Sequence, residues 1–419
     1  MNILLLGSGG REHALAIALR KSPLLRHLFA APGNPGIGEH ATLAAIDIAD
    51  HAAVIAFCHV MRIDFVVIGP EGPLVAGLVD DLANAGILAF GPTRAAARLE
   101  GSKGFAKDLC RESGIPSAAY ARFDALSPAL AHLEVEGAPI VVKADGLAAG
   151  KGVVVAQSLP EARAALAALF ADSSAECVIE AVLEGEEASF FALCDGARAL
   201  AFGAAQDHKH AFEGDGGPNT GGMGAYSPAP IVDAAMEARV MATIIQPALD
   251  AMRARKTPFR GMLFAGLMIG ADGPQLIEFN TRFGDPETQV LLPRLRDDLL
   301  PLLLASARGN LPADPARFSP DAALTVVLAA QGYPAAPRIG GAIAGLEQAA
   351  AQPGVTLTHA GTAHSGGNLV AGGGRVLNVT GVGPTLEEAA RRAYAGVDAV
   401  EFPGGYCRRD IGWRVLGRR

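Results

Sequence analysis

The chain has few of the features that would place a protein in an oxidising compartment or in a membrane. Its five cysteines lie far apart and form no Cys-x-x-Cys pair, so neither a disulfide framework nor a zinc site is expected. No run of about 18 apolar residues occurs, so no membrane span is expected. The apolar start at residues 3–6 is cut short by Gly7 and is too brief for a signal peptide. These absences predict a cytoplasmic protein with buried free thiols.

Positive charge is scarce as well. The 35 basic residues are outnumbered by 43 acidic ones, and the formal net charge of -8 disfavours a general nucleic-acid binder. What the chain does have is length and apolar content, with 419 residues, half of them hydrophobic, and 51 glycines and 27 prolines spread along it. This composition predicts a globular enzyme of about two to four domains. We also expect it to act on small molecules, as a monomer or weak dimer.

The first hundred residues repeat a pattern of strand, turn and helix. Short apolar runs at residues 2–6, 28–31, 64–69 and 87–91 read as buried strands, and glycine or proline ends or follows each of them. Strands that alternate with helices form a parallel sheet, whose loops gather at the carboxyl ends of the strands. We therefore predict a small parallel sheet with a ligand crevice along that edge.

The loop after the first strand suits a phosphate better than a dinucleotide. Glu12 stands where the third glycine of a dinucleotide fingerprint would fall, and no acidic residue closes the second strand to hold a ribose. Residues 9–11 still offer free backbone N–H groups and a cation at a helix N-terminus. Asn34 and Glu71 would line the same crevice, so a small phosphorylated ligand is expected there. The alternative is that these glycine- and proline-rich turns simply end strands.

A second unit begins near Ser102 and contains a lysine in an apolar strand. Lys143 lies among valines, which is costly unless its ammonium group meets an anion. The glycine-rich loop at 146–152 resembles a P-loop, but the glycine spacing is one residue short and a strand at 153–156 follows instead of a helix. We therefore predict a flap between two strands that covers phosphates with its backbone.

Weaker signals follow between residues 177 and 226. Glu180 ends one predicted strand and Glu187 begins the next, where they could read the amino and ribose groups of a nucleotide, although acid clusters are more often solvated turns. The glycine-rich stretch 218–226 permits close approach of a ligand, but flexible surface loops look alike. His208 could serve as a base, but a lone histidine is more often a polar contact.

The segment 275–289 carries the strongest chemical signal. Strand periodicity places Glu278 and Asn280 on one face, with Ile277 and Phe279 on the apolar side. A carboxylate and an amide oxygen suit Mg²⁺, which takes oxygen ligands and keeps several waters. Asp272-Gly273 predicts an antiparallel hairpin with the preceding apolar strand. The alternative is a strand edge with solvated charges.

Reacting groups are expected just beyond that strand. Arg282, Asp285 and Glu287 follow it in a loop that contains glycine and proline, a common place for catalytic side chains. Helical spacing runs from 290 to 308, and prolines at 311–320 mark a boundary before a third unit. The chemistry of that unit does not reveal a function.

Taken in order, Lys143, the flap, the acid cluster and the Glu278-x-Asn280 strand resemble the ATP-grasp ligases. The chain is similar, more closely, to the phosphoribosylamine-glycine ligase family, and the similarity covers nearly all of it. The motifs that carry the resemblance lie at residues 7–14, 31–35, 69–71, 99–103, 143–153, 206–209, 218–228 and 282–289.

The resemblance implies an α/β and α+β multidomain protein. An N-terminal parallel-sheet pre-ATP-grasp domain would span 1–101, and a central ATP-grasp fold 102–316, with its small flap lobe at about 120–190. A C-terminal mixed α/β domain would span 317–419. The implied reaction belongs to de novo purine biosynthesis. ATP activates glycine as an acyl phosphate, the amine of 5-phosphoribosylamine displaces phosphate, and ADP, phosphate and glycinamide ribonucleotide leave.

The same resemblance assigns residue roles. ATP binding falls to Lys103, Lys143, Gly146, Gly150, Lys151, Gly152, Glu180, Val182 and Glu187. The metal, Mg²⁺ or Mn²⁺, falls to Glu278 and Asn280, and catalysis to Arg282, Asp285 and Asp207. Glycine and the ribose phosphate substrate fall to Gly9, Gly10, Arg11, Glu12, Asn34, Glu71, Asn219, Thr220, Gly221, Gly222, Met223 and Gly224.

The sequence departs from the family pattern in places, and other functions remain open. Ala181 follows Glu180 where a second acid is common, Gly72 replaces a usual alanine, and segment 171–176 is short. None of these departures removes a metal or phosphate ligand. The alternatives are an ATP-grasp carboxylate-amine ligase with another acceptor and a non-catalytic nucleotide sensor. An oxidoreductase is the weakest reading, because the dinucleotide fingerprint is incomplete.

Overall fold

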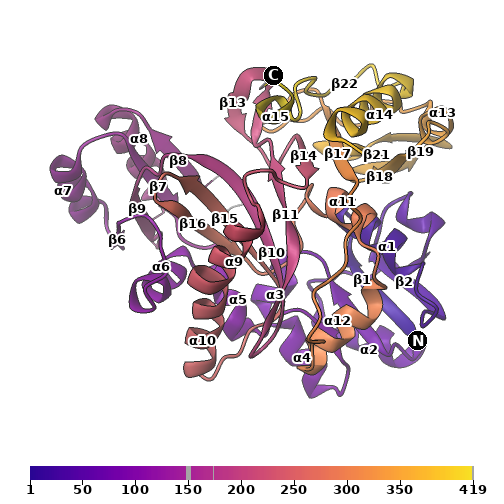
Figure 1. The fold of residues 1–419 in the computed structure, drawn as a ribbon, viewed down its shortest axis with the longest axis horizontal. Coiled ribbons are helices and arrows are strands. Elements are labelled where there is room, and N and C mark those ends of the chain that lie inside the picture. Colours follow the sequence, from indigo (N-terminus) through magenta and orange to yellow (C-terminus); the bar gives the residue numbers. More distant parts are fainter. Residues whose placement is uncertain (148–151, 173, 418–419) are drawn as a thin grey trace.

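The computed structural model describes residues 1–147, 152–172 and 174–417 of the chain. Helices and strands are mixed throughout the chain. The three main sheets are a five-stranded sheet in the N-terminal region, a four-stranded sheet in a small lobe, and a nine-stranded sheet that runs from the centre into the C-terminal region (Figure 1). Within the described residues, no helix is both long and apolar enough to cross a membrane.

The N-terminal region is a parallel sheet with helices packed around it. Its five strands run in the order β3-β2-β1-β4-β5, and every pair is parallel. The sequence predicts four of them and misses β3, because two exposed residues carry no periodicity. The strands are β1 (Asn2–Gly7), β2 (His27–Pro32), β3 (Thr42–Leu43), β4 (Phe65–Ile68) and β5 (Ala89–Phe90), and the helices are α1 (Gly10–Leu19), α2 (His51–Met61), α3 (Glu71–Ala76), α4 (Leu78–Asn84) and α5 (Arg94–Gly101).

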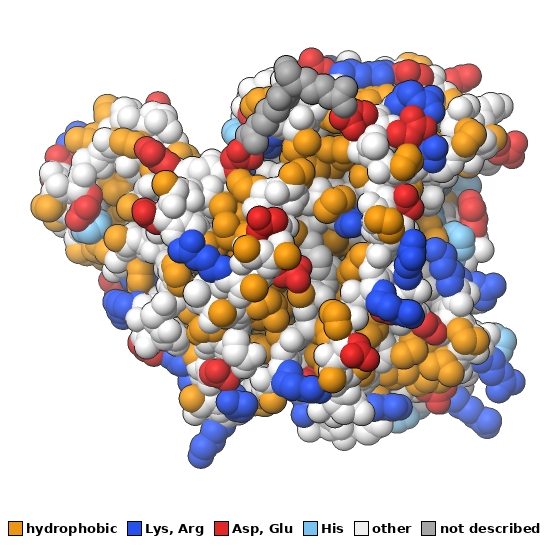
Figure 2. All heavy atoms as spheres, viewed as in Figure 1, with side chains coloured by type: hydrophobic (Ala, Val, Ile, Leu, Met, Phe, Trp, Pro, Cys, Tyr) orange, Lys and Arg blue, Asp and Glu red, His pale blue; other side chains and the backbone are white. Residues whose placement is uncertain are grey.

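A small lobe stands apart from the rest of the molecule, and the surface is hollowed between them (Figures 1 and 2). Its four-stranded antiparallel sheet runs in the order β6-β9-β7-β8. Leu133, Val142, Leu166 and Ile179 are buried in its own core. The lobe comprises β6 (Tyr120–Phe123), α7 (Leu126–Glu136), β7 (Ile140–Ala144), β8 (Val153–Ala156), α8 (Leu159–Leu169) and β9 (Cys177–Ala181).

A nine-stranded sheet runs from the centre of the molecule into the C-terminal region. Its order is β16-β15-β10-β11-β14-β17-β21-β18, with β22 paired to β17. The step between the two regions is the antiparallel pair β14·β17. The strands are β10 (Glu186–Asp195), β11 (Ala199–Asp207), β14 (Gly224–Ser227), β15 (Arg260–Gly270), β16 (Gly273–Asn280), β17 (Ala322–Ala330), β18 (Val355–His359), β21 (Arg375–Gly383) and β22 (Gly405–Tyr406).

Two small hairpins and the remaining helices pack around this sheet. The hairpins are β12 (His210–Phe212) with β13 (Gly216–Asn219), and β19 (Thr362–Ser365) with β20 (Asn368–Ala371). The helices are α6 (Lys103–Glu112), α9 (Ala234–Val240), α10 (Gln246–Ala254), α11 (Thr288–Leu291), α12 (Leu299–Arg308), α13 (Leu346–Ala350), α14 (Leu386–Ala399) and α15 (Trp413–Leu416), with a π-helical turn at Met241–Ile245 and 3₁₀ turns at Ile37–Glu39, Glu213–Asp215 and Leu292–Arg294.

The single helical segment predicted over 290–308 is wrong. The chain forms α11, then the 3₁₀ turn at Leu292–Arg294, and then an extended link before α12. Pro293 cannot donate the backbone hydrogen bond that a continuous helix needs at its position. A new helix starts after Asp298, whose side chain accepts a 3.0 Å hydrogen bond from the Leu300 backbone.

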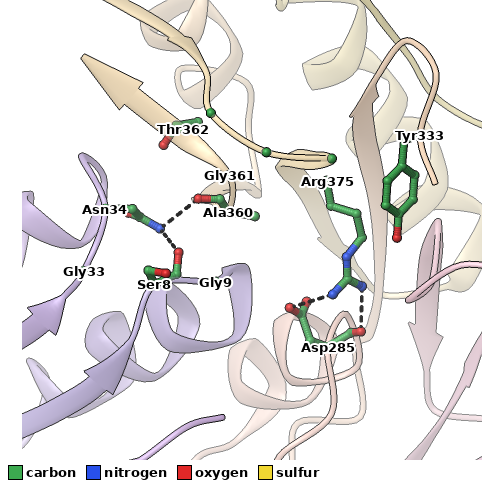
Figure 3. Close-up of a pocket in the computed structure, with 13 residues that line it drawn as sticks. Ser8, Gly9, Gly33, Asn34, Asp285, Tyr333, Ala360, Gly361, Thr362 and Arg375 are labelled. Atoms are coloured by element: carbon green, nitrogen blue, oxygen red, sulfur yellow. Dashed lines mark hydrogen bonds and ion pairs between the residues drawn. The ribbon is translucent and has the colours of Figure 1, made fainter. Parts of the chain in front are cut away.

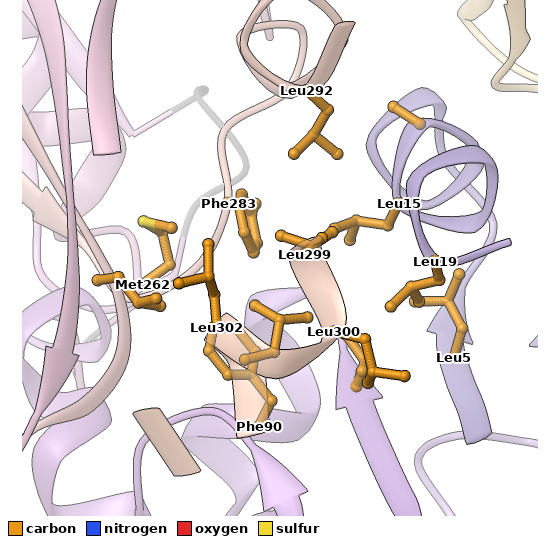
Figure 4. Packing of buried hydrophobic residues seen from close by; sticks show 14 of the residues in the cluster. Leu5, Leu15, Leu19, Phe90, Met262, Phe283, Leu292, Leu299, Leu300 and Leu302 are labelled. Atoms are coloured by element: carbon orange, nitrogen blue, oxygen red, sulfur yellow. The ribbon is translucent and has the colours of Figure 1, made fainter. Parts of the chain in front are cut away.

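One apolar cluster joins the N-terminal region to the large sheet (Figure 4). Leu15 of α1 and Leu300 of α12 belong to it, and so does Phe283 in the loop after β16. The Phe283 ring meets Phe202 edge to face at 5.8 Å and lies 6.0 Å from Phe90. These contacts anchor the loop that carries Arg282 and Asp285.

Candidate active site

β16 forms a floor with two oxygen donors. The pairing of β15 with β16 shifts between Gly266 and Leu267, so the strict alternation fails at that point. Leu276 and Phe279 therefore both enter the core, whereas Ile277, predicted on the apolar side with Phe279, is only half-buried. Glu278 and Asn280 flank Phe279 and so face away from the core.

The two donors fit a hard cation. The Glu278 carboxylate makes no hydrogen bond or ion pair with the described residues, and the Asn280 Oδ1 accepts only a long 3.4 Å bond from Arg282. In the described part of the chain, no group of three His, Cys, Asp or Glu side chains is placed to hold a metal. A cation here would therefore complete its shell with water and phosphate oxygens, as Mg²⁺ commonly does.

Three lysines gather opposite this floor. Lys143 Nζ lies 2.9 Å from Glu180 Oε1, and Lys107 Nζ lies 2.8 Å from Glu180 Oε2. The side chains of Lys107, Lys143 and Glu180 are all buried. Burial lowers the pKa of Lys107, and the charge of Glu180 opposes that change. Lys103 Nζ donates to the Gly146 carbonyl oxygen at 2.8 Å, and burial lowers its pKa against the opposing charge of Glu278. Among the described residues, Glu180 is the one acid paired with this group of three lysines, so the cluster suits an added anion.

The base of the flap is ordered by short-range contacts. Gly146 has φ +88, which favours glycine, and the Ala144 backbone donates to the Gly152 carbonyl at 2.8 Å. Asp145 accepts from Ser102 Oγ at 2.9 Å, which ties the flap to the start of α6. Gly150 and Lys151, predicted as ATP contacts, lie outside the described residues.

Glu180 and Glu187, the two acids predicted to contact the nucleotide, both form ion pairs with lysines. Glu180, the second-last residue of β9, is held between Lys107 and Lys143, two residues before Val182. Glu187 Oε2 pairs with Lys209 Nζ at 2.6 Å, and this cation is the main reason that the pKa of Glu187 is lowered. The roles predicted for these acids at the adenine and ribose therefore stay predictions.

Arg282 connects the metal strand to the N-terminal region. Its guanidinium lies 2.8 Å from Glu71 Oε2 and 3.1 Å from Glu100 Oε1. Glu100 also accepts from the backbone and hydroxyl of Thr281, at 2.8 and 3.0 Å. Burial would lower the pKa of Arg282, but Glu100 and Glu71 raise it, so the cation is permanent. It is fixed in place before any substrate binds.

Two residues predicted to bind substrate are engaged with the protein itself. Glu12 accepts from the Gly9 backbone at 2.7 Å and from Arg11 Nε at 2.6 Å, and its contact with Gly9 caps the start of α1. Asn34 donates to the Ser8 and His359 carbonyl oxygens, both at 2.8 Å, and accepts from the Ile37 backbone. Both side chains shape the crevice, and Glu12 is 1% exposed.

The crevice is a cavity of about 370 Å³ where three parts of the chain meet (Figure 3). Gly9 and Asn34 line it from the N-terminal region, and Asp285 lines it from the loop after β16. The C-terminal region supplies the remaining wall, including the glycine-rich turn before Arg375. Its lining is Ser8, Gly9, Gly33, Asn34, Asp285, Tyr333, Ala360, Gly361, Thr362, Gly372, Gly373, Gly374 and Arg375.

The glycine-rich loop of residues 219–224 contacts two residues that line this cavity, Tyr333 and Arg375. Gly222 has φ +107, and a Cβ there would meet Pro286 Cδ at 2.5 Å. A Cβ at Gly224 would meet the Thr325 carbonyl oxygen at 2.6 Å. Thr220 is buried and its hydroxyl accepts from the Gly222 backbone at 3.0 Å. Met223 is fully buried, while Asn219 pairs with His210 in the β12·β13 hairpin.

Asp207 and His208 differ sharply in their surroundings. Burial raises the pKa of Asp207 to about 7, with Lys209 opposing and Glu287 and Glu187 adding to the rise. His208 is fully buried, its Nε2 accepts from the Gly412 backbone at 3.1 Å, and burial lowers its pKa to about 3. His208 therefore acts as a polar contact, as its sequence context suggests.

Comparison with known proteins places these features in one family. Three family models match: the phosphoribosylglycinamide synthetase N domain over residues 1–100, its ATP-grasp (A) domain over 101–288 and its C domain over 323–414. The chain belongs to the phosphoribosylglycinamide synthetase family. The three-part mixed α/β architecture with a central ATP-grasp domain is thereby confirmed.

Relatives of this synthetase family match end to end. A phosphoribosylamine-glycine ligase from Mesorhizobium japonicum is 61% identical over 100% of this chain and 99% of its own length. The crystal structure of the Thermotoga maritima ligase is 32% identical, with a TM-score of 0.86 over 98% of this chain and 100% of that one. A biotin carboxylase domain from Hydrogenobacter thermophilus, with a TM-score of 0.73 at 16% identity over 97% of this chain and 91% of that one, shares the fold.

Sequence reasoning did not assign several residues that the structure of this synthetase family member brings into the site. Lys107 carried a usable signal, a second lysine one helical turn after Lys103. Glu100 lies in the motif at residues 99–103, but its contact with Arg282, far along the chain, could not be predicted from that motif. Arg375 gave no signal, because it meets Asp285 only through folding, 90 residues away.

Proposed function

We propose that this chain catalyses the ATP-dependent ligation of glycine to 5-phosphoribosylamine, giving glycinamide ribonucleotide, ADP and phosphate. Membership of the phosphoribosylglycinamide synthetase family and end-to-end similarity to ligases of that name support this reaction. The position of Asp285 is the observation that best supports this reaction at the candidate site. Asp285 follows the oxygen-donor strand and also lines the cavity where the three regions meet.

The nucleotide half of the proposed site lies between the lysine cluster and β16. Lys103 and Lys143 would neutralise ATP phosphates, and the flap from Gly146 to Gly152 would cover them. Glu278 and Asn280 would hold a divalent cation, Mg²⁺ or Mn²⁺, which screens the charge of the phosphate oxygens when bound. The unengaged Glu278 carboxylate supports this assignment.

The chemistry divides into two transfers. A glycine carboxylate oxygen attacks the γ-phosphorus of ATP, the bond to ADP breaks, and glycyl phosphate forms. The acceptor nitrogen then attacks the glycyl carbonyl carbon, phosphate leaves, and the nitrogen loses a proton. Arg282 would stabilise the developing negative charge from a fixed position. Asp207, with a pKa of about 7, is suited to receive that proton near neutral pH.

The acceptor half lies in the 370 Å³ cavity. We assign the ribose phosphate to this cavity, with Gly9 lining it and the backbone N–H groups of Gly10 and Arg11 at the start of α1 as the candidate phosphate donors, since the Gly9 N–H is already bound by Glu12. Asn34 and Glu12 support that backbone from behind, and Glu71 holds Arg282. The loop of residues 219–224 and Asp285 would then orient glycine and the amine.

The remaining assignments concern organisation. We propose domains at 1–101, 102–316 and 317–419, with the flap lobe at about 120–190. The antiparallel pairing β14·β17 would then join the second and third domains through one continuous sheet. A monomer or weak dimer in the cytoplasm, acting only on small molecules, completes the proposal.

The test follows phosphate release from ATP by purified protein supplied with glycine and freshly generated 5-phosphoribosylamine. We expect one phosphate per glycinamide ribonucleotide and little release when either co-substrate is omitted. Ribose 5-phosphate, which lacks the amine, should not replace the acceptor. Release that is indifferent to both co-substrates would overturn the proposal, and binding of ATP without turnover would favour a nucleotide sensor.

A further inference from the structure

Arg375 makes an unusual set of contacts for a residue outside the nucleotide site. It begins β21 in the C-terminal region and reaches the loop after β16 (Figure 3). Its Nη2 lies 3.0 Å from Asp285 Oδ2, and its Nη1 donates to the Asp285 carbonyl oxygen at 2.8 Å. The same Nη1 donates to the carbonyl oxygen of Gly221. One guanidinium therefore holds both the side chain and the backbone of Asp285, together with the loop of residues 219–224.

The carboxylate of Asp285 is held from two sides. Gln289 Nε2 donates to Asp285 Oδ1 at 2.7 Å, while Arg375 takes Oδ2. Burial would lower the pKa of Arg375, but Asp285 raises it, so the cation persists at all working pH values. The planar fork of arginine directs N–H groups on two separate nitrogens at the carboxylate and the carbonyl oxygens, whereas a lysine would have to make all of these contacts from one nitrogen.

The loop of residues 219–224 depends on the same contact. The Gly221 backbone donates to the Tyr333 hydroxyl at 3.0 Å, and its carbonyl accepts from Arg375. A Cβ at Gly221 would lie 3.0 Å from Arg375 Cζ, so the guanidinium packs directly on the loop backbone. Tyr333 and Arg375 thus connect the C-terminal region to the loop along the cavity wall.

We propose that Arg375 is a positioning residue for the acceptor half of the reaction, holding Asp285 and the 219–224 loop in the arrangement that receives the amine. This inference rests on the proposed function. It separates the two halves of the site: Arg375 has no contact with the lysine cluster or with Glu278 among the described residues, so ATP binding should not depend on it. The C-terminal region also has other attachments, such as the β14·β17 pairing, which should keep the fold intact without Arg375.

The experiment measures KM for each substrate in Arg375→Ala and Arg375→Lys. Loss of the hydrogen bonds from the Arg375 guanidinium to Asp285 and Gly221 should raise KM for 5-phosphoribosylamine by about tenfold to a hundredfold. KM for ATP should change by less than about twofold. Phosphate released per product should rise above one, because glycyl phosphate that waits for a misplaced acceptor hydrolyses. Arg375→Lys should recover only part of the loss, since it restores the charge without the fork.

Arg392→Ala supplies the matched control. Arg392 lies in the same region at similar exposure, pairs with Glu388 at 2.7 Å and donates to the Val382 carbonyl oxygen at 2.7 Å, away from the cavity. Its loss should leave all KM values and the coupling ratio unchanged. An acceptor KM in Arg375→Ala that matches Arg392→Ala, or an equal rise in every KM, would overturn the inference.

The failures of the two proposals are distinguishable. If the wild-type protein shows no dependence on 5-phosphoribosylamine, the proposed function fails before any variant is compared. If the wild type is active and the variants behave alike, only the role of Arg375 fails. Melting temperatures of all three variants identify a folding defect, and where Arg375→Ala is unstable the folded Arg375→Lys decides the outcome by the ratio of the two KM changes.

Discussion

At the scale of single residues, one buried carboxylate shared by two lysines lies at the centre of the proposed anion site. Glu180 contacts Lys143 through one oxygen and Lys107 through the other. If Lys143 binds a phosphate of ATP, as proposed, Lys107 can still satisfy Glu180. A buried acid left without a partner would be costly, so the second lysine permits the first to move.

Replacing Lys107 with methionine should therefore weaken ATP binding. Glu180 would retain only Lys143 and hold it more firmly, so we expect the Kd for ATP to rise by about tenfold and the free energy of unfolding to fall by about 1–3 kcal/mol. Calorimetric titration and urea unfolding measure the two effects. The double variant Lys107→Met/Glu180→Gln removes the leftover charge and should recover part of the ATP affinity, and a double variant no better than the single one would contradict this account.

Glu278→Gln should separate activity from stability. The Glu278 carboxylate makes no hydrogen bond or ion pair with the described residues and acts on Lys103 and Lys209 only through its charge, so its neutralisation should change the free energy of unfolding by less than about 1 kcal/mol. Turnover should fall by about a hundredfold or more, and more Mg²⁺ should be needed for half-maximal rate. Asp272→Asn, at the exposed tip of the same hairpin, is the control and should leave both unchanged. Equal losses of rate and stability in Glu278→Gln would point to a structural role.

How far single residues could be predicted from the sequence depends on where their partners lie. Lys143 was identifiable because a lysine in an apolar strand demands an anion, and Glu278 and Asn280 because a strand places alternate residues on one face. Asn34 was predicted as a ligand, yet its amide is taken by backbone atoms, one of them in His359. Arg375 could not be found, since no local pattern encodes a contact across the fold.

At the scale of elements, irregular backbone places the chemistry. The bulge in the β15·β16 pair turns Leu276 and Phe279 into the core together, which sequence periodicity could not reveal. The break at Pro293 likewise divides a predicted helix and leaves Phe283 anchored in the core beside α12. Regular strands and helices were predictable from the periodicity of apolar residues and from the glycine and proline residues that end them. These interruptions depend instead on packing between segments that are distant in sequence.

Gly222 is the element-scale position most sensitive to a side chain. Gly222→Ala must adopt φ +107 and bring a Cβ within 2.5 Å of Pro286, so the loop of residues 219–224 should shift. We expect a loss of about 1–3 kcal/mol in the free energy of unfolding and a higher KM for the acceptor. Gly72→Ala is the control, because a Cβ there meets nothing within 4 Å. Denaturant unfolding curves that coincide for the two variants would refute the strain at Gly222.

At the scale of the whole molecule, three histidines mark the contact between the N-terminal and C-terminal regions. The His359 backbone donates to His13 Nδ1 at 2.8 Å, and the His13 ring lies 5.3 Å from that of His40 and 5.6 Å from that of His359. Burial, followed by His359 and His40, lowers the pKa of His13 from 6.5 to about 3. Burial lowers that of His359 to about 4, with His364 adding to the change. The contact is therefore built from neutral imidazoles.

The stability of the molecule should consequently fall as the pH drops below 6.5. Between about 6.5 and 3 the unfolded chain binds a proton at His13 that the folded chain excludes, so the free energy of unfolding decreases, by about 2 kcal/mol from this residue at pH 5. His13→Asn keeps a hydrogen-bond acceptor without a titrating group and should flatten the curve by that amount. Exposed His59→Asn should not. Unfolding curves recorded between pH 5 and 7 that are parallel for wild type and His13→Asn would contradict this.

The separate core of the small lobe has a consequence for how the molecule deforms. None of the residues in that core belongs to the clusters that bind the other regions together. The lobe is held to α6 by polar contacts such as Ser102–Asp145 and Lys107–Glu180, so we expect its angle to vary more easily than the spacing between Glu278 and Arg375, which lie in one nine-stranded sheet. In the proposed site, movement of the lobe would therefore open and close access to the nucleotide while the acceptor cavity keeps its dimensions. Exchange of ADP for ATP would then leave the alignment of the amine undisturbed.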